Sequence, residues 1–160
     1  MSARGAPRAA PTLRIGSINL NGLFGSGHFV LAVQLFTNLS FDVVLLQEHH
    51  LTTSRAAPAL DLFLAEGWTA FLSCASSTSS TAGVGILVRT ALLSAGSVCV
   101  SEVVHSEGRL SKIRVQWSGH DFDLICAYFP ASRPVDTKDY ITNCLRPLVS
   151  LPRLCCWRRF

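Results

Sequence analysis

Apolar residues fall into short runs and helical spacings along the first part of the chain, and these patterns predict alternating strands and helices. Strands are predicted over 12–17 and 41–47, where apolar residues run together between polar flanks. Residues 28–39 carry apolar side chains three and four positions apart, which predicts an amphipathic helix. A second helix is predicted over 57–66, and it ends at Gly67.

Beyond residue 67 the pattern changes to alternation and short apolar runs, which predict strands. These strands are 68–73, 83–89, 97–104, 110–117 and 122–129, with a Ser/Thr loop at 76–82 and a turn at 118–121. A last helix is predicted over 136–148, with Asp136 or Thr137 as its cap. Helices that alternate with strands and are followed by consecutive strands indicate an α/β layered domain.

Composition narrows the class of protein. A length of 160 residues predicts one domain, and 49% hydrophobic residues with 15% charged ones predict a large core. No apolar run reaches ~18 residues, so no membrane span and no membrane partner are predicted. Residues 1–11 contain arginines and no apolar run, which predicts a basic disordered tail rather than a secretory signal, with a transit peptide as the alternative.

Neither the cysteines nor the net charge predicts a binding site. Six cysteines lack the spacing of a zinc site, and Cys99 and Cys126 are expected to be buried small hydrophobes. We therefore expect a reducing compartment, nuclear or cytoplasmic, and no disulfide-linked partner. The net charge of +4 comes from arginines near the two ends, because residues 15–145 carry 7 basic and 10 acidic side chains. Charge alone thus predicts no shaped surface for nucleic acid.

Oxygen-bearing side chains follow the two predicted strands of the first part of the chain. Asn19 and Asn21 come after the first strand, and Glu48 comes directly after the second. If both strands open on the same side of a sheet, these groups suit a hard cation such as Mg²⁺. Ordinary alternatives remain, because a carboxylate often follows a buried strand and asparagine is common in turns.

Four further residues have both a structural and a chemical interpretation. Tyr128 ends the last predicted strand, where a tyrosine is commonly a residue at the edge of the core. Arg109 lies either in a solvated hairpin turn or where its guanidinium can clamp a phosphate with two hydrogen bonds. His49 and His50 follow Glu48 without forming H-E-x-x-H, and we expect both to be solvated loop histidines.

Five short motifs in order carry a family resemblance. SINLNGL, VVLLQEH, GVGILV, EGRL and ICAYFP, spread over residues 13–130, resemble the endonuclease/exonuclease/phosphatase superfamily. They most resemble the endonuclease domains of non-LTR retrotransposon polyproteins. The resemblance implies a four-layered α/β sandwich, with two β-sheets flanked by helices, of which about the first half is present.

The resemblance also implies roles for individual residues. In that family the glutamate matching Glu48 binds the catalytic Mg²⁺, for which Mn²⁺ is a possible substitute, and Asn19 lies beside metal and phosphate. Asn21 would position the scissile phosphate, and Tyr128 would donate a hydrogen bond to it. The family usually places Asn after its Y-x-P motif, whereas this chain has Ala131 there.

Two motifs of the family are missing. A G-D-x-N motif and a terminal S-D-H motif supply the aspartate that orients the water and the histidine that acts as general base. Residues 131–160 contain neither motif and no histidine. With suitable codons, CCWRRF read one nucleotide later becomes Ala-Ala-Gly-Gly-Asp, so we expect a truncated domain over 12–154 and a frame-shifted tail over 155–160.

These observations predict a Mg²⁺-dependent DNA endonuclease, or phosphodiesterase, that is inactive as this 160-residue chain and whose natural partner is DNA. One alternative is a phosphatase of the same superfamily that acts on lipid or inositol phosphates. The other is a non-catalytic fragment that binds nucleic acid through its arginine-rich tails. Fold alone does not choose among these substrates.

Overall fold

The computed structural model describes residues 12–23, 27–75, 82–129, 138–139 and 142–143. In chain order its elements are β1 (Ile15–Asn19), α1 (His28–Asn38), β2 (Val43–Gln47), α2 (Thr53–Ala65), β3 (Trp68–Ser73), β4 (Val84–Arg89), α3 (Thr90–Ser94), β5 (Val98–Ser106), β6 (Leu110–Trp117) and β7 (His120–Ala127). The predicted helix over 136–148 lies almost wholly outside the described residues. No described helix is long and apolar enough to cross a membrane.

The strands form two separate sheets. The first has the order β1-β2-β4-β3, in which β1 and β2 are parallel and the other two pairs are antiparallel. The second is an antiparallel meander in the order β5-β6-β7. The parallel pair has Asn19 opposite Gln47, so the carboxyl ends of β1 and β2 lie side by side.

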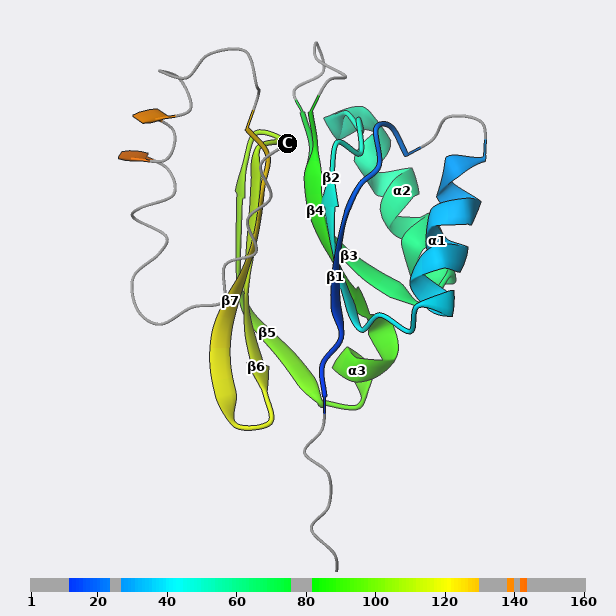
Figure 1. Cartoon of the computed structure of the whole chain (residues 1–160), viewed down its shortest axis with the longest axis vertical. Coiled ribbons are helices and arrows are strands. Elements are labelled where there is room, and N and C mark those ends of the chain that lie inside the picture. Colours follow the sequence, from blue (N-terminus) through cyan, green and yellow to red (C-terminus); the bar gives the residue numbers. More distant parts are fainter. Residues whose placement is uncertain (1–11, 24–26, 76–81, 130–137, 140–141, 144–160) are drawn as a thin grey trace, which may run out of the picture.

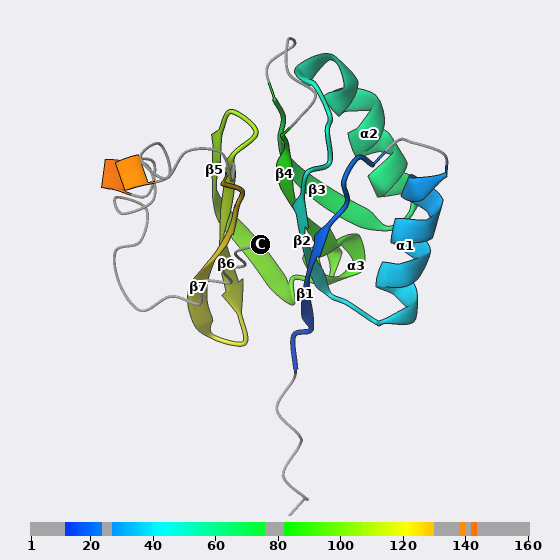
Figure 2. The ribbon, with the colours of Figure 1, turned by 45° about the horizontal axis from the view of Figure 1, so that its top comes forward.

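The two sheets and two of the helices form layers (Figures 1 and 2). The helices α1 and α2 cover one face of the first sheet, and the second sheet faces the other. Phe36 of α1 and Phe63 of α2 are buried against Leu46 and Leu87 of the first sheet. A second core fills the space between the sheets, and its fully buried members include Val43, Leu45, Ile86, Ile113 and Val115.

The structure confirms the α/β class and its two sheets. The described residues contain three layers of the expected sandwich, and the predicted helix 136–148 lies almost wholly outside them. The predicted bounds of 68–73 and 110–117 agree with β3 and β6.

Other predicted bounds were wrong for physical reasons. Helix α2 begins at Thr53 and continues through Pro58, which removes one hydrogen bond without ending the helix. Strand β7 begins at His120 because Ser118 and Gly119, with φ of 51° and 79°, form a two-residue hairpin turn that brings the strands together early.

Two expectations about small features also needed correction. The short helix α3 was not predicted, since its five residues are too few to show a period. Cys126 is buried as expected, but Cys99 is exposed on β5, where alternating side chains face away from the core.

Candidate functional site

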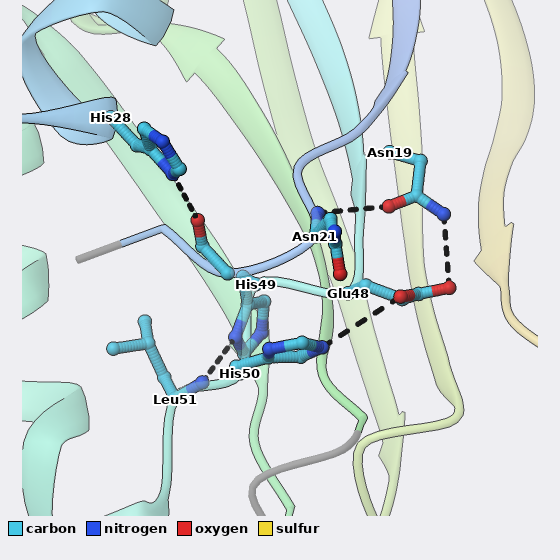
Figure 3. A network of polar contacts seen from close by, with 8 residues as sticks. Asn19, Asn21, His28, Glu48, His49, His50 and Leu51 are labelled. Atoms are coloured by element: carbon cyan, nitrogen blue, oxygen red, sulfur yellow. Dashed lines mark hydrogen bonds and ion pairs between the residues drawn. The ribbon is translucent and has the colours of Figure 1, made fainter. Parts of the chain in front are cut away.

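The carboxyl ends of β1 and β2 bring the predicted oxygen ligands together (Figure 3). Because the two strands are parallel and in register, the segments that follow them leave the sheet as neighbours. Backbone bonds join these segments: Leu20 N–H donates to the carbonyl of Gln47 over 2.9 Å, and Gly22 N–H to that of Glu48 over 2.8 Å. Asn19 and Glu48 therefore lie on one side of the sheet, as the sequence predicted.

The backbone around the carboxylate is strained. Glu48 and His50 have φ of 52° and 57°, and Asn21 in the neighbouring segment has φ of 45°. This left-handed region is disfavoured for side chains other than glycine, and asparagine tolerates it best. The turn moves Glu48 out of the strand's alternation and points its carboxylate toward Asn19.

Each oxygen of Glu48 lies near a polar side chain. The Nδ2 of Asn19 donates to Oε1 over 3.0 Å, and the Nε2 of His50 lies 3.7 Å from Oε2. The Oδ1 of Asn19 in turn accepts from the backbone N–H of Asn21 over 2.9 Å. Asn19 thus orients the carboxylate, and Asn21 orients Asn19 through its backbone.

The second sheet supplies the other two predicted site residues. The backbone N–H of Tyr128 donates to the carbonyl of Arg109 over 2.9 Å, and the Arg109 guanidinium lies 5.6 Å from the centre of the Tyr128 ring. Burial raises the pKa of the Tyr128 phenol, and so do its hydrogen bond to Glu48 and that residue's charge, while Arg109 opposes the rise. Tyr128 therefore remains a proton donor at neutral pH and contacts Glu48 across the sheets.

One polar atom in this group has no partner. The Nη1 of Arg109 is buried and makes no hydrogen bond to any residue that the structure describes. Buried donors without partners are rare, and each is a candidate for binding an external acceptor.

Of the two histidines after Glu48, His49 is not the solvated loop residue that we expected. His49 is 1% exposed; its Nδ1 accepts from Leu51 N–H over 3.0 Å, and its Nε2 donates to the carbonyl of Val84 over 3.1 Å. Burial lowers its pKa to about 4, so the ring is neutral. The expectation failed because the turn at Glu48 directs His49 into the protein beside Gly83 and leaves His50 against the carboxylate.

The metal-binding capacity of the group is small. Among the residues that the structure describes, no three His, Cys, Asp or Glu side chains gather closely enough to hold a metal ion. Glu48 offers one carboxylate, and the oxygen of Asn19 is already bonded to Asn21. This donor set fits Mg²⁺, which uses few carboxylates and keeps several waters, with weak affinity.

The structure thus brings all five predicted site residues into one group: Asn19, Asn21, Glu48, Arg109 and Tyr128. Their catalytic and ligand roles are not tested by this placement and stay predictions. The residue that sequence reasoning missed is His50. The sequence places His50 two residues after Glu48, but this spacing indicates a contact only when the geometry of the turn is known.

Comparison with known proteins gives a fold but no close relative. No protein-family model matches the sequence, and no curated protein matches it. Solved structures do match. An AP endonuclease from Leishmania major is 16% identical with a TM-score of 0.63, covering 84% of this chain and 46% of that one.

Two other solved structures are similar to the same extent. The endonuclease domain of TRAS1, a telomere-specific non-LTR retrotransposon, is 13% identical with a TM-score of 0.58, covering 88% of this chain and 56% of that one. An endonuclease/exonuclease/phosphatase family protein from Leptotrichia buccalis is 11% identical with a TM-score of 0.61, covering 90% and 66%. The chain therefore has the fold of these proteins and spans about half to two thirds of their lengths.

Proposed function

We propose that this chain carries the metal- and phosphate-binding part of a Mg²⁺-dependent DNA endonuclease of the endonuclease/exonuclease/phosphatase superfamily. The observation that carries the proposal is the meeting of opposite charges at one end of the sandwich. Glu48 comes from the first sheet, and Arg109 and Tyr128 come from the second. An anion-binding pair facing an oriented carboxylate is what a metal-assisted attack on a phosphodiester requires.

The residues divide the work according to their chemistry. When bound, Mg²⁺ neutralises the negative charge that develops on the phosphate oxygens. Glu48 would hold it, with Asn19 keeping the carboxylate in place. The buried Nη1 of Arg109 would donate to the phosphate, and the phenol of Tyr128 would exchange its hydrogen bond to Glu48 for one to the phosphate.

As a 160-residue chain the protein is proposed to be inactive. Activation of the attacking water needs a base, and general-base catalysis contributes roughly 10²–10⁴-fold. His49 is excluded from this role because both ring nitrogens are bonded inside the protein. His50 contacts Glu48 and is the described histidine nearest to the site.

The further proposals rest on the motifs of the sequence. The order of SINLNGL, VVLLQEH and ICAYFP favours origin in a non-LTR retrotransposon, with DNA as the partner and a nuclear or cytoplasmic location. The fold shared with the TRAS1 endonuclease domain is consistent with this origin. Reverse-transcriptase sequence downstream in the same locus would support it, and a phosphatase context would contradict it.

Plasmid nicking and DNA binding test the proposal together. We expect nicking in Mg²⁺ to equal the buffer control, and a short DNA to bind better with Mg²⁺ than without it. Glu48→Ala and Arg109→Ala should each remove the increase in DNA binding that Mg²⁺ causes. Glu66→Ala, at the exposed end of α2, should retain that increase.

Two results would contradict the proposal. Nicking that Glu48→Ala abolishes would show an active chain with His50 as the candidate base. Salt-sensitive binding that ignores both substitutions would instead identify a fragment that binds through its arginine-rich tails.

A further inference from the structure

The side chains facing the space between the sheets change character toward the site. The inward rows contribute Ile15 of β1, Leu45 of β2 and Leu124 of β7 to the core. Two positions farther toward the site, each row has a side chain that forms hydrogen bonds: Ser17 on β1, Gln47 on β2 and Cys126 on β7. A polar tier thus separates the apolar core from the site, and we use this name for Ser17, Gln47, Ser111 and Cys126.

Cys126 joins the two sheets within this tier. Its Sγ donates to the carbonyl of Leu46 over 3.1 Å and accepts from the Nε2 of Gln47 over 3.4 Å. The same amide nitrogen donates to the Oγ of Ser17 over 3.0 Å. Cys126 is 1% exposed, so its bond to Leu46 forms where water does not compete.

A second bond between the sheets lies beside the first. Ser111 is paired with Cys126 in the register of β6 and β7, and its Oγ donates to the carbonyl of Phe71 on β3 over 3.2 Å. The apolar core below attracts the sheets without fixing a direction, because the hydrophobic effect is non-directional. Hydrogen bonds do fix direction, so the tier sets how the sheets align where the site begins.

Tyr128 lies two residues after Cys126 on the same row, and Glu48 directly follows Gln47. A displacement between Cys126 and β2 would therefore be passed to the contact between Tyr128 and Glu48. Burial raises the pKa of the Cys126 thiol to about 12, so the thiol keeps its proton at every working pH.

We propose that Cys126 is a positioning residue, which through its bonds to Leu46 and Gln47 holds the second sheet at the spacing that brings Tyr128 to Glu48. The inference concerns the geometry of the site. Only its consequence for metal affinity rests on the proposed function.

The phenol of Tyr128 reports this spacing directly. The chain has two tyrosines, so Tyr140→Phe leaves Tyr128 alone. With fluorotyrosine at that position, fluorine NMR at one fixed pH reports the surroundings of the ring in the folded full chain. We expect its resonance to differ from the resonance in Glu48→Ala, because the phenol contacts Glu48.

Three variants separate positioning from general stability. Cys126→Val keeps an apolar side chain but removes both bonds, and we expect the resonance to move toward its position in Glu48→Ala. Cys126→Ser keeps a donor and an acceptor and should retain the resonance of the parent chain. Leu124→Ala weakens the same row by leaving a cavity, yet cuts no bond of the tier and should also retain it.

The outcomes are decisive in either direction. An unmoved resonance in Cys126→Val, or an equal movement in Cys126→Ser or Leu124→Ala, would overturn the proposal. In a separate measurement, Cys126→Val should weaken Mn²⁺ binding by about 10-fold, the lower range for residues that orient a metal ligand. If the unsubstituted chain binds no Mn²⁺, the proposed function fails while the fluorine resonance still tests Cys126.

Discussion

The residues around Glu48 show how one buried side chain supports a strained turn. Glu48 and His50 both adopt left-handed φ, at a cost of about 1–3 kcal/mol each. Between them His49 bonds through both ring nitrogens to Leu51 and Val84. The imidazole therefore anchors the turn that presents the carboxylate, and its neutral form is required for both bonds.

This anchoring predicts a loss of stability in mild acid. The pKa of His49 falls from 6.5 to about 4 on folding, so the unfolded chain takes up a proton first as the pH drops. Its contribution is present above pH 6.5 and is lost toward pH 4, which amounts to about 3 kcal/mol. We expect His49→Gln to reduce this fall in the free energy of unfolding, measured by urea titration at several pH values.

The exposed His120, at the turn between β6 and β7, provides the control. His120→Gln should retain the loss of stability that we attribute to His49. An equally steep loss of stability in His49→Gln would mean that other groups, such as carboxylates, cause it.

At the scale of elements, the loop between β5 and β6 places Arg109 by close backbone contact. Gly108 N–H donates to the Oγ of Ser73 over 2.9 Å, and its carbonyl accepts from Gly83 N–H over 2.9 Å. A Cβ on Gly108 would lie 2.9 Å from the backbone nitrogen of Ala75, which cannot move aside as a flexible side chain could. The φ of Gly108 is +69°, which adds strain to any substitution.

We therefore expect Gly108→Ala to be destabilising beyond its conformational strain. Left-handed strain costs about 1–2 kcal/mol, and the clash adds about 1–3 kcal/mol. Gly96→Ala is the matched control, because Gly96 has φ of +66° and no atom within 4 Å of the added carbon. Thermal unfolding of both variants measures the difference, and equal losses would show that the loop moves aside without cost.

The elements also show what the sequence can predict. Runs such as VVLLQ, apolar on both faces, locate β2 because its side chains pack against helices on one side and the second sheet on the other. Turn geometry is harder to predict. The early start of β7 depends on the paired left-handed residues Ser118 and Gly119, and the continuation of α2 through Pro58 depends on packing.

At the scale of the whole molecule, the site exists only because two sheets face each other. The sequence located Asn19 and Glu48 at strand ends, since parallel neighbouring strands must end together. The family resemblance placed Tyr128 at the same site, but the strand pattern could not show that Tyr128 would contact Glu48 from the other sheet, nor that Arg109 would keep a buried donor unpaired. Those contacts depend on the spacing between sheets, which no local pattern encodes.

The central claim is that Glu48 is the metal ligand of a site shared by the two sheets, and Mn²⁺ titration followed by NMR of the backbone amides tests it most directly. We predict weak binding, with paramagnetic broadening centred on Glu48, Asn19 and Tyr128. Glu48→Gln should abolish the broadening, and Glu66→Gln should preserve it. Broadening that is centred elsewhere, or that persists in Glu48→Gln, would contradict the claim.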